Sequence, residues 1–164
     1  MNRTIALLLL VLIAVIFTPT DSTSAVAAGN TPSASGHGNI RINDGELRTF
    51  SFHAMTRKDG TVTGNTTLHN RDQDVFVKLD IDCLRVVGNT AYVSGVITQH
   101  SNPDFLGFKG RFRVVDNGEG ANNPPDLMSL VANSPPTSTS DCNSPSNAFP
   151  ALNDIEGGNV QVKP

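Results

Sequence analysis

Apolar and polar residues alternate with a period of two through most of the chain beyond residue 38, and this pattern limits the fold more than any other feature. The alternating segments span residues 38–42, 50–55, 62–68, 75–83, 91–97, 108–114, 127–131 and 159–163. No helical period occurs among them, so the sequence predicts about eight short strands. One-sided alternation is typical of antiparallel sheets with one buried face and one face in water.

The turn signals and the ends of this region favour a closed sheet. Asp59-Gly60 and Gly88-Asn89 lie between alternating segments, as in tight β-hairpins. Pairing of segment 38–42 with segment 159–163 would remove both sheet edges. We therefore expect an all-β fold, a small antiparallel β-barrel of about eight strands, with a two-sheet β-sandwich as the alternative. The apolar phase predicts a narrow interior filled by Phe50, Phe52, Val77, Leu79, Phe108 and Phe112.

The first 28 residues have the features of a secretory signal peptide. Arg3 precedes an apolar run over residues 5–17, and small residues end at Ala27 and Ala28, where we expect cleavage. As a helix the run would extend about 20 Å, short of the roughly 30 Å hydrocarbon core, although an uncleaved membrane anchor is the alternative. We expect a secreted or periplasmic protein with no membrane contact after signal removal.

Two regions beyond the signal peptide depart from the alternating pattern. Residues 29–37 are small and polar and predict a disordered leader before a single β domain at 38–164. Residues 132–158 are rich in Pro, Ser and Asn and predict a long loop.

The two cysteines predict a disulfide bond in an oxidising compartment. Cys83 falls on the apolar phase near the end of segment 75–83, and Cys142 lies in the middle of the long loop. A bridge between them would hold the loop over one mouth of the barrel.

One acidic segment is a candidate metal site. Asp116, Glu119 and Asp126 could supply oxygen ligands to Ca²⁺, although their spacing is not that of an EF-hand. The alternative is a hairpin turn at Asn117-Gly118. We expect no other cofactor, because the histidines are widely separated; they are His37, His53, His69 and His100.

Charge and composition argue against nucleic-acid binding and offer little for catalysis. The net charge is −3 and aromatic residues make up 5% of the chain, without tryptophan. Asp80 and Asp82 share the wet face of one segment, where they could act on a glycoside or pair with basic residues of segment 108–114. Those basic residues are Lys109, Arg111 and Arg113. No nucleophile motif is present, and we assign no catalytic residue.

Three turn-and-strand motifs resemble a known group. They are Gly-Asn-Thr-Ala-Tyr-Val-Ser-Gly at 88–95, Val-Val-Asp-Asn-Gly-Glu at 114–119 and Gly-Gly-Asn-Val-Gln-Val at 157–162. The chain resembles the small exported bacterial proteins of the post-COAP-1 type over residues 36–131 and 157–163. The resemblance implies a β fold and an exported location, and it carries over no catalytic residue, cofactor or ligand.

The sequence thus leads us to expect a secreted, non-enzymatic β domain that binds a ligand or a surface partner. The residues of the chain do not indicate which ligand or partner this is. A binding or cell-surface interaction module is the first interpretation. A small barrel that binds an apolar ligand or a glycan is the alternative, and a hydrolase is the third.

Overall fold

The computed structural model describes residues 31–43, 45–120 and 122–164. The predicted signal peptide at 1–28, with its cleavage positions Ala27 and Ala28, lies outside these residues. The strands are β1 (Ser33–Arg41), β2 (Leu47–Thr56), β3 (Val62–Asn70), β4 (Val75–Val87), β5 (Thr90–His100), β6 (Lys109–Val115), β7 (Leu127–Ser129), β8 (Ala132–Ser134) and β9 (Leu152–Lys163). Two short 3-10 helices follow β5 and β8, namely η1 (Pro103–Phe105) and η2 (Ser146–Ala148).

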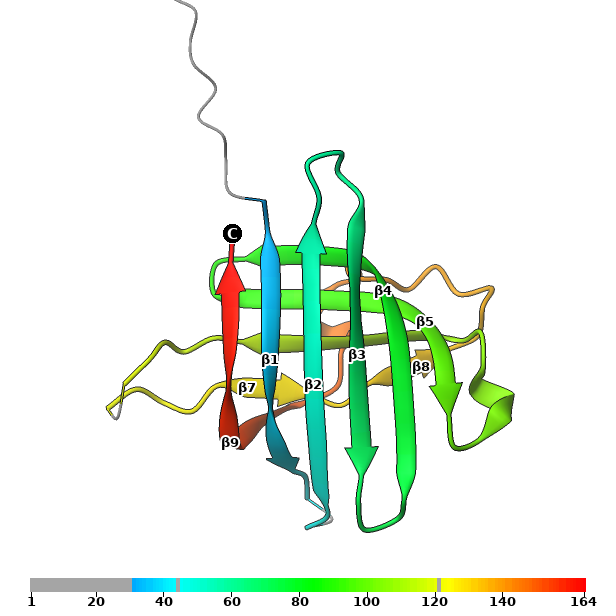
Figure 1. The fold of residues 1–164 in the computed structure, drawn as a ribbon, viewed down its shortest axis with the longest axis horizontal. Helices are drawn as coiled ribbons and strands as arrows, with labels where there is room; N and C mark the ends of the chain where they lie inside the picture. The colour runs from blue at the N-terminus through cyan, green and yellow to red at the C-terminus, as the bar shows by residue number, and fades with distance from the viewer. Residues whose placement is uncertain (1–30, 44, 121) are drawn as a thin grey trace, which may run out of the picture.

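The strands form a closed antiparallel barrel. Consecutive strands β1 to β7 pair in turn, β7 pairs with β9, and β9 returns to β1 (Figure 1). These eight strands complete the barrel, and β8 adds a short extra strand beside β6. The predicted β-barrel is confirmed, and so is its closure by the first and last strands.

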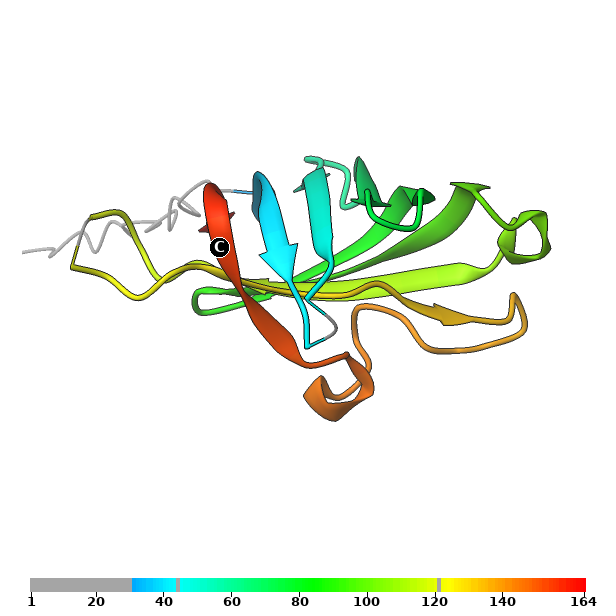
Figure 2. The ribbon, with the colours of Figure 1, turned by 90° about the horizontal axis from the view of Figure 1, so that it is seen from below.

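The barrel is flattened into two layers whose strands run crosswise. In Figure 1, β9, β1, β2 and β3 lie in front, while β6, β7 and β8 cross behind them. The long strands β4 and β5 bend from one layer into the other (Figures 1 and 2). Their pairing shifts register between Lys78 and Leu79 and again between Ile81 and Cys83, and such bulges bend a strand sharply.

Aromatic and branched side chains from both layers fill the interior. The rings of Phe52 and Phe112 meet edge to face at 5.4 Å, and Phe50 stacks beside Phe52. Predicted interior residues Val77 and Leu79 are also buried. Phe108, just before β6, packs partly buried against this core.

The predicted hairpin turns are present. Gly60 has a φ of +82° between β2 and β3, and Gly88 has a φ of +59° between β4 and β5. In the first turn the hydroxyl and the amide N–H of Thr61 donate to Asp59 Oδ1. These hydrogen bonds hold the pKa of the Asp59 carboxyl below its ordinary value.

The predicted disordered leader is wrong for residues 33–37, which belong to β1. Ser33 pairs with Met55 of β2 on one side and with Lys163 of β9 on the other. Small residues with low strand propensity adopt this conformation because both neighbouring strands offer a complete ladder of backbone partners.

The predicted loop at 132–158 is also too long. Residues 132–134 form β8, and β9 begins at Leu152, where Ile155 enters the core. The remaining segment, residues 135–151, is called the strap below. Figure 2 shows it in orange, beneath the layer that contains β6 and outside the barrel.

Candidate functional site

The predicted disulfide joins Cys83 of β4 to Cys142 of the strap, with Cα atoms 5.7 Å apart. The bulge at Asp82 changes the phase of β4, so Leu84 and Val86 contact the core in place of Cys83. Because Cys83 therefore faces outward, the strap lies on the outer wall of the barrel. The prediction that the bridge holds it over a barrel mouth is wrong.

Three arginines from the outer wall hold the strap through its backbone carbonyls. They are Arg85, Arg111 and Arg113. Arg85 Nε donates to the carbonyl of Cys142 at 2.9 Å, and Arg111 Nε donates to the carbonyl of Ala148 at 3.0 Å. Arg113 makes a longer contact at 3.4 Å, and its buried Nε has no partner among the described residues.

A small apolar cluster lies between the strap and the outer wall. Phe149 is buried against Tyr92 of β5, with ring centroids 5.1 Å apart. The Arg85 guanidinium lies over the Tyr92 ring, 3.9 Å from its centroid. The Cys142 amide donates to the hydroxyl of buried Ser94. The strap is thus packed as part of the fold.

The predicted pairing of Asp80 and Asp82 with the basic residues of β6 is wrong. Both carboxylates are exposed, and in the described part of the chain neither forms an ion pair. The arginines of β6 instead donate to the strap and to β8.

The structure gives Asp116 and Asp126 a role in closing the barrel. β7 pairs with β9 only over residues 152–154, which leaves later amides of β9 without a strand on that side. Asp126 Oδ2 accepts the Val160 N–H at 2.8 Å, and Asp116 Oδ2 accepts the Val162 N–H at 2.9 Å. The two carboxylates replace the missing strand as hydrogen-bond acceptors.

The candidate Ca²⁺ ligands are therefore already engaged with protein donors. Asp126 Oδ1 accepts the Asn117 N–H, and Glu119 Oε1 accepts the side-chain amide of Asn159 at 2.7 Å. No group of three or more metal-binding side chains occurs in residues 31–43, 45–120 and 122–164. The connection from β6 to β7 runs from 116 to 126, longer than the hairpin turn predicted at Asn117-Gly118, although Gly118 does have a φ of +86°.

The histidines are dispersed, as the sequence indicates. His37, His53 and His69 lie on the outward-facing phase of β1, β2 and β3, and His69 pairs with Asp74 at 3.0 Å. His100, at the end of β5, is different because it lines a cavity.

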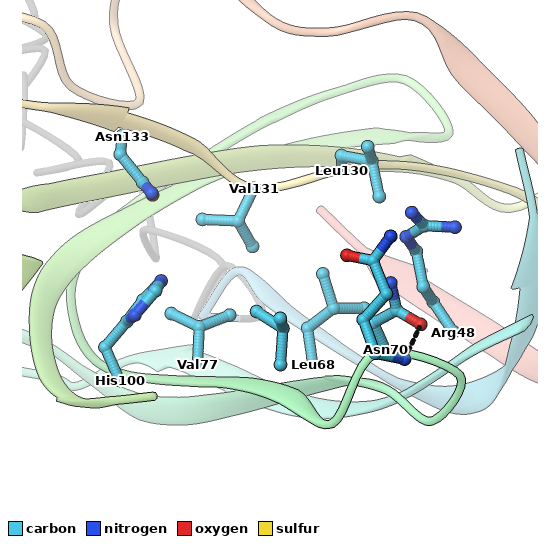
Figure 3. A pocket seen from close by; sticks show the side chains of 10 residues that line it. Arg48, Leu68, Asn70, Val77, His100, Leu130, Val131 and Asn133 are labelled. Carbon is cyan, nitrogen blue, oxygen red and sulfur yellow. Dashed lines mark hydrogen bonds between the residues drawn. The ribbon is translucent and has the colours of Figure 1, made fainter. Parts of the chain in front are cut away.

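This cavity, called the end cavity below, opens at one end of the barrel between the two layers. Its volume is about 230 Å³. It is lined by Arg48, Leu68, Asn70, Gln73, Val75, Val77, His100, Leu130, Val131 and Asn133. In Figure 3, Leu130 and Val131 point from one wall toward Val77 and Leu68 on the other. The middle of the cavity is therefore apolar, and polar side chains lie at its two ends.

Polar groups at one end of the end cavity are bound to a single carboxylate. Glu46 Oε2 accepts from the Arg48 guanidinium at 3.1 Å and from the Asn70 amide at 2.6 Å. Glu46 Oε1 accepts from the Gln73 amide, also at 2.6 Å. Three lining side chains are thus fixed, and the positive charge of Arg48 has a counter-ion.

His100 and Asn133 lie at the opposite end, on facing walls (Figure 3). The backbone N–H of Asn102 donates to His100 Nδ1 at 2.9 Å. In the neutral ring the proton must then lie on Nε2, which leaves Nε2–H as a donor. Neither Nε2 nor the Asn133 amide has a hydrogen-bond partner among the residues that the structure describes.

Sequence reasoning missed the end cavity although it found part of its wall. The alternating pattern placed Val77 inward, and the structure confirms its burial. It also predicted a strand through residue 131, whereas β7 ends at Ser129 and the chain turns aside. Leu130 and Val131 line the cavity because of this break, which no turn residue marks in the sequence.

Comparison with models of protein families, with curated proteins and with solved structures finds no match to this chain. The resemblance to post-COAP-1-type proteins stays a prediction. No helix within the described ranges is long and apolar enough to span a membrane.

Proposed function

We propose that the protein is an exported, non-enzymatic binding domain that holds a small, mainly apolar ligand in the end cavity. The cavity itself carries the proposal: apolar side chains line its middle, and its volume is about 230 Å³. A cavity of about 150 Å³ is enough for benzene with its six carbon atoms, so the ligand is a molecule of roughly six to ten non-hydrogen atoms.

Two other features support this proposal. The Cys83–Cys142 disulfide suits an oxidising compartment, as expected for a secreted or periplasmic protein. The Glu46 network holds Arg48, Asn70 and Gln73 in place without a ligand, so one end of the cavity is organised in advance. Of the binding roles left open by the sequence, a small-molecule ligand is therefore preferred to a surface partner.

Filling the end cavity tests the proposal. Val77 lines the cavity, and a Val77→Phe substitution places an aromatic ring in its apolar middle. The matched control is Val87→Phe, because Val87 lies on the same strand but is 55% exposed at its far end. The probe is benzene, and the measurement is the thermal midpoint of each protein with and without it.

We expect benzene to stabilise the wild type and the Val87→Phe variant and to leave Val77→Phe unchanged. At ten times its dissociation constant a ligand adds about 1.4 kcal/mol to the free energy of unfolding. The larger side chain can itself lower the thermal midpoint through overpacking. Because each variant is compared with itself with and without benzene, this effect cancels. Equal stabilisation of both variants, or none of the wild type, would contradict the proposal.

A further inference from the structure

The two polar ends of the end cavity differ in one respect that bears on the ligand. At the Arg48 end, both oxygens of the Glu46 carboxylate already accept hydrogen bonds from lining side chains. At the other end, His100 Nε2 and the Asn133 amide face the cavity without a protein partner among the described residues. The His100 end therefore offers a ligand polar groups that no described residue of the protein satisfies.

The hydrogen bond from Asn102 sets the character of this end. Because His100 Nδ1 accepts the Asn102 N–H, the neutral imidazole presents Nε2–H as a donor. The ring also contacts Phe105 of η1, with centroids 4.8 Å apart, which limits its rotation. A ligand atom that meets Nε2 must consequently be a hydrogen-bond acceptor.

Charge favours an uncharged acceptor. Arg48 is the charged side chain of the lining, and it lies at the far end in an ion pair with Glu46. A carboxylate beside His100 would lose hydration without gaining a lining cation. A neutral carbonyl oxygen loses much less hydration, and its two lone pairs allow it to accept from both Nε2–H and the Asn133 amide.

We propose that the end cavity selects small uncharged carbonyl compounds, with the carbonyl oxygen bound by His100 Nε2–H and the Asn133 amide and the apolar body between Leu68, Val77 and Val131. This inference rests on the proposed function, because it assumes that the end cavity binds a small molecule. It adds the chemical class of that molecule and the two residues that determine it.

Three probes of nearly the same shape separate the contributions. Acetophenone has a carbonyl beside an aromatic ring, α-methylstyrene replaces that oxygen with a methylene group, and benzoate replaces the acetyl group with a carboxylate. Their dissociation constants are measured on the intact, disulfide-bonded chain by titration followed in amide NMR spectra. We expect acetophenone to bind about tenfold more tightly than α-methylstyrene, since one or two uncharged hydrogen bonds are gained, and benzoate to bind most weakly.

Variants at the polar end assign this preference to its residues. His100→Leu should remove most of the preference for acetophenone while leaving α-methylstyrene binding nearly unchanged, and Asn133→Ala should reduce it by a smaller factor. His100→Gln should restore part of it, because the glutamine amide is again a donor. Asn133 is exposed, so its variant tests the proposal even if substitution at His100 impairs folding.

The outcomes separate this inference from the proposed function. Binding of α-methylstyrene without any preference for acetophenone, or a preference that survives both His100→Leu and Asn133→Ala, would overturn the carbonyl proposal alone. Tighter binding of benzoate would also overturn it. Failure of all three probes to bind would overturn the proposed function together with it.

Discussion

At the scale of single residues, carboxylates of this barrel accept hydrogen bonds from donors that are not paired in the β-sheet. Asp126 is 8% exposed, and each of its carboxylate oxygens accepts one backbone N–H at 2.8 Å. Glu46 likewise organises one end of the end cavity through both oxygens. In both places a single carboxylate accepts hydrogen bonds from two or more donors at once.

Replacing the Asp126 carboxylate should therefore destabilise the fold. Asp126→Asn retains one acceptor oxygen and turns an NH₂ group toward a backbone N–H, so two charge-assisted hydrogen bonds become one neutral bond. We expect a loss of about 2–3 kcal/mol in the free energy of unfolding, measured by urea denaturation.

The matched control is Asp154→Asn, because Asp154 is exposed on β9 and should change stability by no more than about 0.5 kcal/mol. Added Ca²⁺ should leave the wild-type midpoint unchanged, since these oxygens already have donors. A Ca²⁺-dependent rise in the midpoint that Asp126→Asn removes would instead favour a metal role for this loop.

At the scale of elements, the strap behaves as a covering segment with its own small core. Its contacts to the outer wall combine the disulfide, the arginine–carbonyl hydrogen bonds and the packing of Phe149 on Tyr92. Its composition predicted a loop, and the cysteines predicted its attachment. The face to which it is attached depended on the bulge at Asp82, which shifts Cys83 outward.

Breaking the disulfide should weaken the protein and alter its intrinsic fluorescence. The bridge joins residues that are 59 positions apart in the sequence. Because a disulfide lowers the conformational entropy of the unfolded chain, its removal should lower the free energy of unfolding by about 4 kcal/mol. Tyr92 is the chain's one tyrosine, and the chain has no tryptophan, so fluorescence excited at 280 nm reports directly on the covered wall. Denaturation and fluorescence of wild type and a Cys83→Ser/Cys142→Ser double variant measure both effects.

A Phe149→Ala variant separates the packing of the strap from its covalent attachment. With the disulfide intact, loss of the Phe149 ring should change Tyr92 fluorescence. Reduction of the disulfide should then lower the free energy of unfolding of this variant by as much as it does in the wild type. An unchanged Tyr92 signal after both reduction and Phe149→Ala would contradict the packing of the strap on this wall.

At the scale of the whole molecule, barrel closure depends on the close approach of β1 and β9. Gly158 of β9 lies opposite Gly38 of β1 and has a φ of +121°. A Cβ atom at Gly158 would lie 1.9 Å from the His37 carbonyl oxygen. The two strands approach this closely because neither carries a side chain at the pairing.

Substitution of Gly158 should therefore open the seam between these strands. Gly158→Ala adds a steric clash to the strain of a positive φ. We expect it to lower the free energy of unfolding by about 3 kcal/mol. Gly107→Ala is the control, because Gly107 also has a positive φ, +80°, with no atom within 4 Å of the added Cβ. The Gly107→Ala variant should lower the free energy of unfolding by about 1 kcal/mol. Equal urea midpoints for the two variants would contradict the dependence of barrel closure on the close approach of β1 and β9.

The sequence by itself determined the strand pattern, the buried faces and the partner of each cysteine. Phe52, Val77 and Phe112 follow directly from alternation, because a strand's side chains point to opposite faces whatever the strand pairs with. The tertiary structure alone decided the start of β1 at Ser33, the outward position of Cys83 and the end cavity. A glycine-rich strand, a bulge and a strand that stops at Ser129 each depend on backbone partners far away in the chain, and local alternation carries no information about those partners.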